Sequence, residues 1–357
     1  MKLGVHSRKV ILKYLTRLLV SRDFENVGDL LELYARLNDQ VMTGELLRYA
    51  RNNGVAHIFY EALAERGLER SELARALAKD AEAVYRNAQY RDELLRLLVD
   101  VLEEGGIEYV VFKTFNQLGI VDVDVDIIVQ REAYWDTVKR LISKGFKPVD
   151  DLEKTYATGF VIKGNPLIVD LHTEVTILGI PYVNSETLFK HKARVKYRSN
   201  CCGSIDLYVL DSPAEALTRI AHSVIKEAEI KIDDISEVLK VAKEQPSELA
   251  KLLKVEELDP ALFFFAEKVD RELCLGIRKP ESFDSRRGLR VLRGIVSRGK
   301  GIPPYHLPRL VSVAVLIHRV RRRSEVGLLL RVLENLKYRR NVAHIGSLLV
   351  KRLRGLQ

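Results

Sequence analysis

The spacing of apolar residues divides the chain into a helical first part, a short middle part with strands, and a helical last part. In residues 1–90 the apolar positions recur every three or four residues, as in VGDLLELYARL and GELLRYARNNGVAHIFYEALAERG, which is the spacing of one helix face. RNAQYRDELLRLLVDVLEE continues this spacing over residues 86–104 and stops at Gly105-Gly106, a typical helix end. We therefore expect the first hundred residues to be helical.

The period of the pattern changes after Gly106. Residues 107–113 form a short apolar run, and VDVDVDIIV over residues 121–129 alternates strictly, as strands do. REAYWDTVKRLISKG, which ends at Gly145, has the pattern of an amphipathic helix. KTYATGFVIKG followed by NPLIVDLHTEV predicts a hairpin, and IDLYVL at residues 205–210 predicts one more strand.

Helical spacing returns at Ser212-Pro213-Ala214-Glu215, which places a cap residue, a proline at the first helical position and an early acid in order. Further helices are expected at about 212–228, 232–244 and 259–275. The predicted fold class is α+β, with a small mixed β-sheet flanked by N- and C-terminal helical regions. The domains we expect are residues 1–85, a helical region; 86–211, an α/β core; and 212–357, a helical region with a basic end.

The composition places the protein among soluble globular chains. With 357 residues and 47% hydrophobic residues it has material for buried cores. Cys201, Cys202 and Cys274 make neither a CxxC pair nor a disulfide framework, which fits a reducing, cytoplasmic setting. Arg and Lys interrupt the apolar N-terminal residues, unlike a signal peptide, and the longest uncharged apolar run after it is far below the roughly 20 residues that span a bilayer.

Positive charge is concentrated at the C-terminal end. The chain carries a net charge of +9, but residues 286–357 hold 18 Lys/Arg against two Glu, or +16, which leaves −7 for the remainder. Such an end suggests a surface for nucleic acid such as RNA, for another polyanion or for an anionic membrane; the alternative is a solvated arginine-rich helical surface. The residues concerned include Arg319, Arg321, Arg322, Arg323, Arg339 and Arg340.

Acidic residues carry the candidate chemistry. The two-residue period of a strand puts Asp122, Asp124 and Asp126 on one face, with same-face neighbours about 6–7 Å apart, so the row repels itself unless a cation is bound. Asp170 is a further acid within an apolar strand pattern. Two carboxylates from one strand and a third from a neighbouring strand suit Mg²⁺ (or Mn²⁺) together with phosphate oxygens. The alternative is an exposed edge strand whose acids are solvated.

These segments resemble the uncharacterised nucleotidyltransferase family of the DNA polymerase beta-like superfamily. The resemblance rests on RNAQYRDELLRLLVDVLEEGGIEYVVFKT, VDVDIIV, IVDLHTEV and SPAEALTRIAHSVIKEAEIKIDDISEVLKVA, which together cover about residues 86–243. It implies that Asp124 and Asp126 are paired metal ligands and Asp170 the third carboxylate. His222 and Asp233 or Asp234 fall in the family's helical motif.

The chain departs from the family pattern after the first strand. The family's Lys-Gly is Lys113-Thr114 here, and the superfamily's Gly-Ser is not present as such. We expect Lys113 to contact a phosphate or to be merely exposed, and Thr114 to open a short helix that offers its hydroxyl and N–H groups to phosphate. His172 shares the face of Asp170 and is expected to be a partner of a metal ligand or an ordinary hydrogen-bonded histidine.

The resulting hypothesis is a metal-dependent nucleotidyltransferase that moves a nucleoside monophosphate from a nucleoside triphosphate to a hydroxyl group of an RNA end, a protein or a small molecule. The alternative is a catalytically degenerate protein that keeps this fold and binds nucleic acid or a protein partner.

Overall fold

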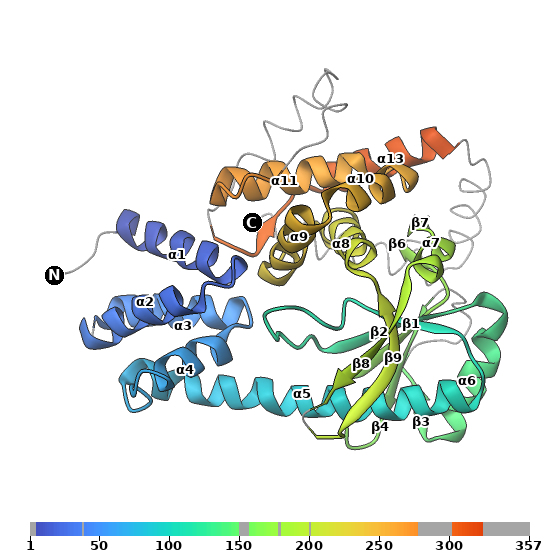
Figure 1. The fold of residues 1–357 in the computed structure, drawn as a ribbon, viewed down its shortest axis with the longest axis horizontal. Helices are drawn as coiled ribbons and strands as arrows, with labels where there is room; N and C mark the ends of the chain where they lie inside the picture. The colour runs from blue at the N-terminus through green and yellow to red at the C-terminus, as the bar shows by residue number, and fades with distance from the viewer. Residues whose placement is uncertain are drawn as a thin grey trace.

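The computed structural model describes residues 5–323 apart from residues 38, 150–156, 178, 179, 200 and 278–301. In the view of Figure 1 a seven-stranded sheet lies at the lower right, the first four helices lie to its left, and the C-terminal helices lie above it. The α+β class with a mixed sheet and helical flanks is confirmed.

The N-terminal helices follow the predicted periodicity. They are α1 (Val5–Val20), α2 (Phe24–Leu37), α3 (Gln40–Asn52), α4 (Ala56–Ala64) and α5 (Glu72–Glu104). Ser71 begins α5 as its cap, because its side chain accepts a hydrogen bond from the backbone N–H of Ala74. The helix then runs unbroken for 33 residues and ends at Gly105, as expected. The boundary that we proposed between residues 85 and 86 therefore lies inside one helix.

The sheet is mixed, and its strand order is β3-β4-β5-β2-β1-β9-β8. The central strand β2 (Asp124–Val129) pairs antiparallel with β1 (Tyr109–Phe112) and parallel with β5 (Ile168–His172). The remaining strands of this sheet are β3 (Phe146–Pro148), β4 (Ala157–Ile162), β8 (Lys192–Arg198) and β9 (Ser204–Leu210). The predicted hairpin is confirmed as β4 and β5, and the predicted strand at 205–210 is β9.

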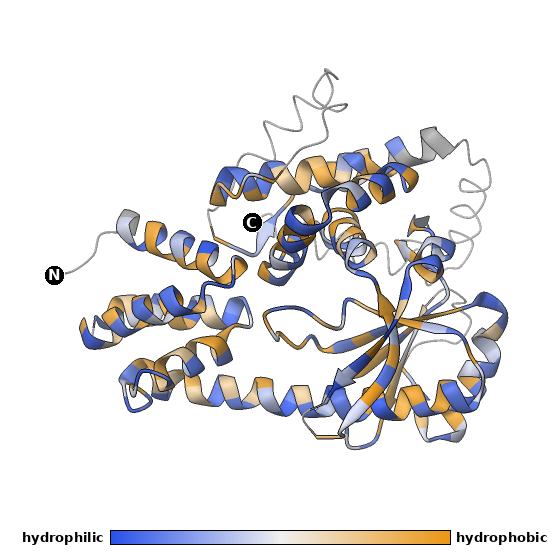
Figure 2. Ribbon diagram, viewed as in Figure 1, coloured by the Kyte–Doolittle hydropathy of each residue, from blue (hydrophilic) through white to orange (hydrophobic). Residues whose placement is uncertain are grey.

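Alternation along the strands gives the sheet two different buried faces. Val111, Ile127 and Leu171 pack with the second half of α5 and with α6 (Tyr134–Ser143), which follows the 3₁₀ turn η1 (Arg131–Ala133). Val110, Phe112 and Ile128 belong to a separate core that includes helices from both ends of the chain. Hydrophobic and hydrophilic residues alternate along the helices that cover these faces (Figure 2). β1 and β2, at the centre of the sheet, are thus buried on both sides.

The C-terminal part begins one residue earlier than predicted. Asp211, rather than Ser212, caps α8 (Ser212–Ala221), because its carboxylate accepts the N–H of Ala214. The helix then continues as a π-helical turn, η2 (His222–Glu227), and stops at Ala228 in the left-handed conformation. The elements that follow are β10 (Glu229–Ile230), α9 (Ile232–Glu244), α10 (Pro246–Val255), α11 (Asp259–Leu273), β11 (Tyr305–His306) and α13 (Arg309–Arg323). The sequence pattern had not predicted α10.

A second small pair of strands lies beside the main sheet. These strands are β6 (Val175–Ile177) and β7 (Ile180–Val183), and the short helix α7 (Ser185–Lys190) follows them. Within the described residues, no helix combines the length and the apolar character needed to cross a membrane.

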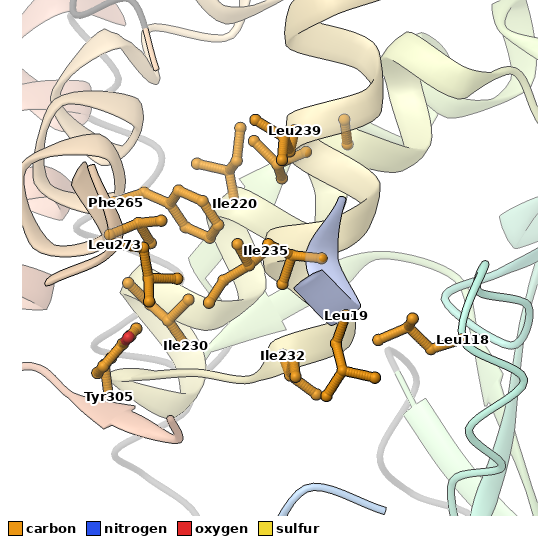
Figure 3. Close-up of a cluster of buried hydrophobic side chains, with 14 of the residues drawn as sticks. Leu19, Leu118, Ile220, Ile230, Ile232, Ile235, Leu239, Phe265, Leu273 and Tyr305 are labelled. Atoms are coloured by element: carbon orange, nitrogen blue, oxygen red, sulfur yellow. The ribbon is translucent and has the colours of Figure 1, made fainter. Parts of the chain in front are cut away.

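One hydrophobic core joins the N-terminal helices, the sheet and the C-terminal helices. Leu19 of α1, Leu118 of the loop after β1 and Ile232 of α9 lie together in this core (Figure 3). The cluster continues through Phe265 of α11 to Tyr305 of β11. Since buried apolar area is the main favourable term in folding, the three parts of the chain stabilise one another.

Candidate functional site

The parallel pairing of β2 with β5 brings the acids to one face of the sheet. Asp126 lies directly beside Asp170, so both side chains point to the same side. Asp124, two residues before Asp126, shares that side and lies beside Ile168. The structure therefore brings the three predicted acids to the sheet face that is covered by the C-terminal helices.

Asp126 is the buried centre of this group, with 5% of its surface exposed. One carboxylate oxygen lies 3.0 Å from Nε2 of His172, and the other lies 2.7 Å from Nζ of Lys113. Burial acts to raise the pKa of Asp126, but Lys113 and His172 lower it by more, so its pKa lies below the usual value. Asp126 is therefore charged, and each of its carboxylate oxygens has one partner, Lys113 or His172.

A possible metal site is formed by Asp126, Asp170 and His172. Each offers one ligand atom, and these atoms lie within 4.8 Å of one another. Nδ1 of His172 is buried without a hydrogen-bond partner, as an unused ligand atom would be. Gly159 of β4 lies opposite Asp170, and a Cβ placed there would lie 3.5 Å from its carboxylate. That is an ordinary van der Waals distance, so the backbone of Gly159 lies directly against the acid. Two carboxylates and an imidazole suit a divalent cation.

Asp170 and Asp124 are both easier to protonate than ordinary aspartates. Burial raises the pKa of Asp170, and repulsion from Asp126 adds to this, while His172 opposes it. Burial and the charge of Asp126 raise the pKa of Asp124 to about 6. A nearby cation would favour the charged forms of both groups. Asp124 thus flanks the three-residue cluster on the same face without being part of it.

Asp122 does not extend the row of acids. The strand begins at Asp124, so the predicted strand from residue 121 is too long, and Val123, expected on the apolar face, is 70% exposed. The carboxylate of Asp122 lies 3.4 Å from Nζ of Lys231, just before α9. Asp122 thus has its partner outside the sheet, which sequence alternation alone does not reveal.

Lys113 ends β1 in a left-handed backbone conformation, with φ of +56°. For a residue with a Cβ this costs on the order of 1–2 kcal/mol. Two side chains of α8 hold it there: Glu215 accepts the N–H of Lys113 at 3.1 Å, and Arg219 donates to its carbonyl at 2.9 Å. This clamp keeps Nζ of Lys113 beside Asp126. The lysine is mostly buried rather than merely exposed, and its contact with a phosphate stays a prediction.

Arg219 was missed by the sequence analysis. Its side chain is 2% exposed and pairs with Glu215 at 2.8 Å and with Asp233 at 2.9 Å. It also lies 3.3 Å from Asp234 and donates to the carbonyl of Phe115 at 2.8 Å. The i,i+4 spacing of Glu215 and Arg219 was the available signal, but that spacing is equally common on exposed helices. Asp233 and Asp234, which the resemblance placed in a helical motif, here hold this arginine.

Thr114 does not begin a helix, so that expectation was wrong. It is buried in a bend, and its hydroxyl donates to the carbonyl of Phe112 at 3.2 Å. The loop continues irregularly because the side chain of Asn116 accepts the N–H groups of Leu118 and Ile120. Local side-chain hydrogen bonds of this kind compete with helix formation.

His222 and Tyr182 lie on the side of the site formed by the C-terminal part. His222 opens the π-helical turn, and its Nδ1 lies 3.2 Å from the hydroxyl of Tyr182. Burial lowers the pKa of His222 well below its usual value, and the charge of Lys113 lowers it further. His222 is therefore a neutral histidine. π-Helical turns are rare and often occur at functional sites.

The structure does not describe the side chains of the arginines in the basic end. Arg319, Arg321, Arg322 and Arg323 belong to the backbone of α13, but their side chains lie outside the described part of the chain. Arg339 and Arg340 lie wholly outside the described residues. The polyanion surface remains a prediction.

Comparisons with known proteins returned little. No family model matches the chain, and no curated protein matches it. One solved structure similar to it is the crystal structure of an antigenic nucleotidyltransferase-like protein from Paracoccidioides brasiliensis. The two share 14% sequence identity, the match covers 55% of this chain and 96% of the other, and the TM-score is 0.33. A likeness of this size assigns no function, which has to be argued from the side chains of the site.

Proposed function

We propose that this protein is a metal-dependent nucleotidyltransferase, which moves a nucleoside monophosphate from a nucleoside triphosphate to a hydroxyl acceptor. The observation that supports this most directly is the register of β2 and β5, which sets Asp126 beside Asp170 with Asp124 on the same face. Carboxylates from two neighbouring strands are the arrangement that divalent cations and phosphate oxygens require.

The residues that would hold Mg²⁺ (or Mn²⁺) are Asp124, Asp126 and Asp170, with His172 as a further ligand or as the partner that orients Asp126. Bound metal supplies charge neutralisation for the phosphates and lowers the pKa of the acceptor hydroxyl. The buried Nδ1 of His172, which has no hydrogen-bond partner, supports the fit of an ion to this site.

The proposed reaction is in-line substitution at the α-phosphorus. The acceptor oxygen forms the new bond to phosphorus, the bond to the β-phosphate oxygen breaks, and pyrophosphate leaves. Asp170 takes the proton of the acceptor hydroxyl. Most of the rate acceleration then comes from positioning and charge stabilisation.

Lys113 and Thr114 are the proposed nucleotide contacts. In the structure Lys113 neutralises Asp126, and we propose that its ammonium group turns to a phosphate of the bound triphosphate. Thr114 follows directly in the loop that α8 holds in place.

The first experiment replaces Asp126 by Asn and measures label transfer from nucleoside triphosphates to mixed RNA, protein and small hydroxyl compounds with Mg²⁺ or Mn²⁺. Transfer should be lost, because the substitution removes a charge at the centre of the site while keeping its shape. Asp122→Asn is the matched control and should retain transfer, since Asp122 pairs with Lys231 outside the cluster. Full activity of the Asp126→Asn protein would refute the proposal.

The second experiment replaces Lys113 by Ala and measures the Kd for a non-hydrolysable nucleoside triphosphate. A hydrogen bond to a charged group contributes about 1.5–3 kcal/mol, so binding should weaken roughly 10- to 100-fold. Lys144→Ala is the control, because Lys144 forms an exposed ion pair with Glu104 away from the acids and should not affect binding. If both variants bind the triphosphate with equal affinity, Lys113 does not contact the nucleotide.

A catalytically degenerate protein is the second candidate. It is favoured by the ion pair of Lys113 with Asp126, since an ammonium group already partners the central carboxylate. Such a protein would bind nucleic acid or a protein partner, for instance RNA through the basic residues 286–357. It would show no label transfer with any metal, while binding to RNA would weaken steeply with salt.

A further inference from the structure

Two adjacent cysteines occupy the turn between β8 and β9, away from the acidic site. Their Sγ atoms lie 2.7 Å apart, not far beyond the S–S bond length of about 2.05 Å. Cys201 is exposed and Cys202 is half-buried, so solvent reaches both. Buried free cysteines usually serve as small apolar residues. This pair has no such packing role.

The turn that carries the two thiols is fixed by side chains. The hydroxyl of Ser199 accepts the N–H groups of Cys201 and Cys202, at 3.2 and 3.0 Å, and itself donates to the buried carboxylate of Asp92 on α5 at 3.0 Å. The N–H of Ser199 closes the turn by donating to the carbonyl of Gly203, whose φ of +72° suits glycine. Three hydrogen bonds at one hydroxyl hold both cysteine backbones in place.

A second anchor comes from Arg96, one helical turn further along α5. Its guanidinium donates to the carbonyls of Cys202 and Ser204, at 2.7 and 2.6 Å. The backbone is therefore held from both sides of the cysteine pair. A pre-organised pair of thiols loses little conformational entropy when its sulfur atoms bond.

We propose that Cys201 and Cys202 are a redox modification site that closes to a reversible disulfide by exchange with a small-molecule disulfide. The exposed thiolate of Cys201 attacks one sulfur of the small disulfide and releases one thiol, which gives a mixed disulfide. The thiolate of Cys202 then attacks Sγ of Cys201 and releases the second thiol. Two cysteine thiols are oxidised to the disulfide and the small disulfide is reduced to two thiols, which take up, through solvent, the two protons that the cysteines lose.

The order of the two steps agrees with the surroundings of each thiol. The hydrogen bond between the two thiols raises the pKa of Cys202, and partial burial adds to this, so its thiolate forms less readily. Cys202 therefore suits the second step, the attack on the mixed disulfide, because the sulfur that it attacks already lies beside it.

The disulfide should also be easy to reduce. Adjacent residues have Cα atoms about 3.8 Å apart across a trans peptide, whereas most disulfides join Cα atoms at least about 4.4 Å apart. The closed ring is therefore strained, and strained, exposed disulfides are the labile ones. The site would respond to redox conditions rather than stabilise the fold permanently.

The test uses the full chain, reduced and then incubated with oxidised glutathione, quenched with acid and labelled with N-ethylmaleimide. Mass spectrometry should show the loss of two hydrogens, no label and no retained glutathione in the peptide that contains Cys201 and Cys202. Dithiothreitol should restore all three labels. Cys274 is exposed, has no neighbouring cysteine, and serves as the internal control that stays labelled or keeps glutathione.

Variants separate the pair from general thiol reactivity. Cys202→Ser should stop at a stable mixed disulfide on Cys201, and Cys274→Ser should still form the internal disulfide. A wild-type protein that keeps glutathione on Cys201, that labels at all three cysteines, or that forms only intermolecular disulfides overturns the proposal.

Discussion

The chemistry of individual residues depends on how Asp126 is surrounded. A buried aspartate is expected to be hard to ionise, but Lys113 and His172 contact one oxygen each and reverse that tendency. Lys113 also lowers the pKa of His222, where burial is the larger cause, and the imidazole is kept neutral. These shifts could not be read from residue order, because they depend on which side chains meet across the sheet.

His222 should make the stability of the fold depend on pH. In the unfolded chain its pKa is near 6.5, and burial lowers it well below that value in the folded chain. Below pH 6.5 the unfolded state therefore binds more protons than the folded state. The contribution of His222 is fully present above pH 6.5 and decreases as pH falls, by up to about 1.4 kcal/mol per pH unit.

The check is urea denaturation of the wild-type and His222→Asn proteins at several pH values between about 7.5 and 5.5. The variant should be less stable at neutral pH, because burial is disturbed, but its stability should fall less steeply on acidification. His306→Asn is the control and should keep the steep fall, since the ring of His306 lies at the surface beside Glu229. Identical slopes for wild type and His222→Asn would show that the imidazole does not cause the effect.

At the scale of elements, periodicity predicted the type of most segments and failed at their ends. The strand over 121–129 was correctly typed, but its first residues leave the sheet where Asp122 meets Lys231. α10 was missed because Pro246 and the residues before it separate two short patterns, each of which is weak alone. Ends of elements are decided by single hydrogen bonds, such as the cap at Asp211, and several residues nearby offer the same chemistry.

The boundary proposed between residues 85 and 86 can be tested on α5. Arg86 is exposed near the middle of this continuous helix, so Arg86→Pro should destabilise the protein by about 3 kcal/mol or more, through a lost backbone hydrogen bond and a steric clash. Arg86→Ala should leave stability almost unchanged. Thermal unfolding followed by circular dichroism measures both. Equal Tm values for the two variants would favour a flexible junction at this position.

At the scale of the whole molecule, Arg219 joins the sheet to the C-terminal helices. It contacts the carbonyls of Lys113 and Phe115 after β1, the acid Glu215 of its own helix and the acid Asp233 of α9. A buried charge with this many partners keeps the loop that carries Lys113 at a set position relative to α8. The candidate site is thus built jointly by the α/β core and the helical region that follows it.

Replacing Arg219 by Met should cost about 3–5 kcal/mol of unfolding free energy, because several buried carboxylates lose their counter-charge. Arg140→Met is the matched control: Arg140 pairs with Asp136 four residues away on an exposed helix face, and its loss should cost under about 0.5 kcal/mol. Urea denaturation of both variants gives the comparison. A small loss for Arg219→Met would mean that the acids are protonated or reach solvent when the arginine is absent.

The sequence by itself determined the α+β class, the type of most elements and the presence of acids at two-residue spacing, because these follow from short-range periodicity and from residue chemistry. Tertiary structure alone decided which groups meet: Asp126 with Asp170 through strand register, His172 and Lys113 on the same carboxylate, and Arg219 across three segments. The physical reason is the separation along the chain over which each kind of signal acts. Periodicity reports on neighbours three or four residues away, whereas burial, charge pairing and metal-ligand distances are set by segments that come together only when the chain packs.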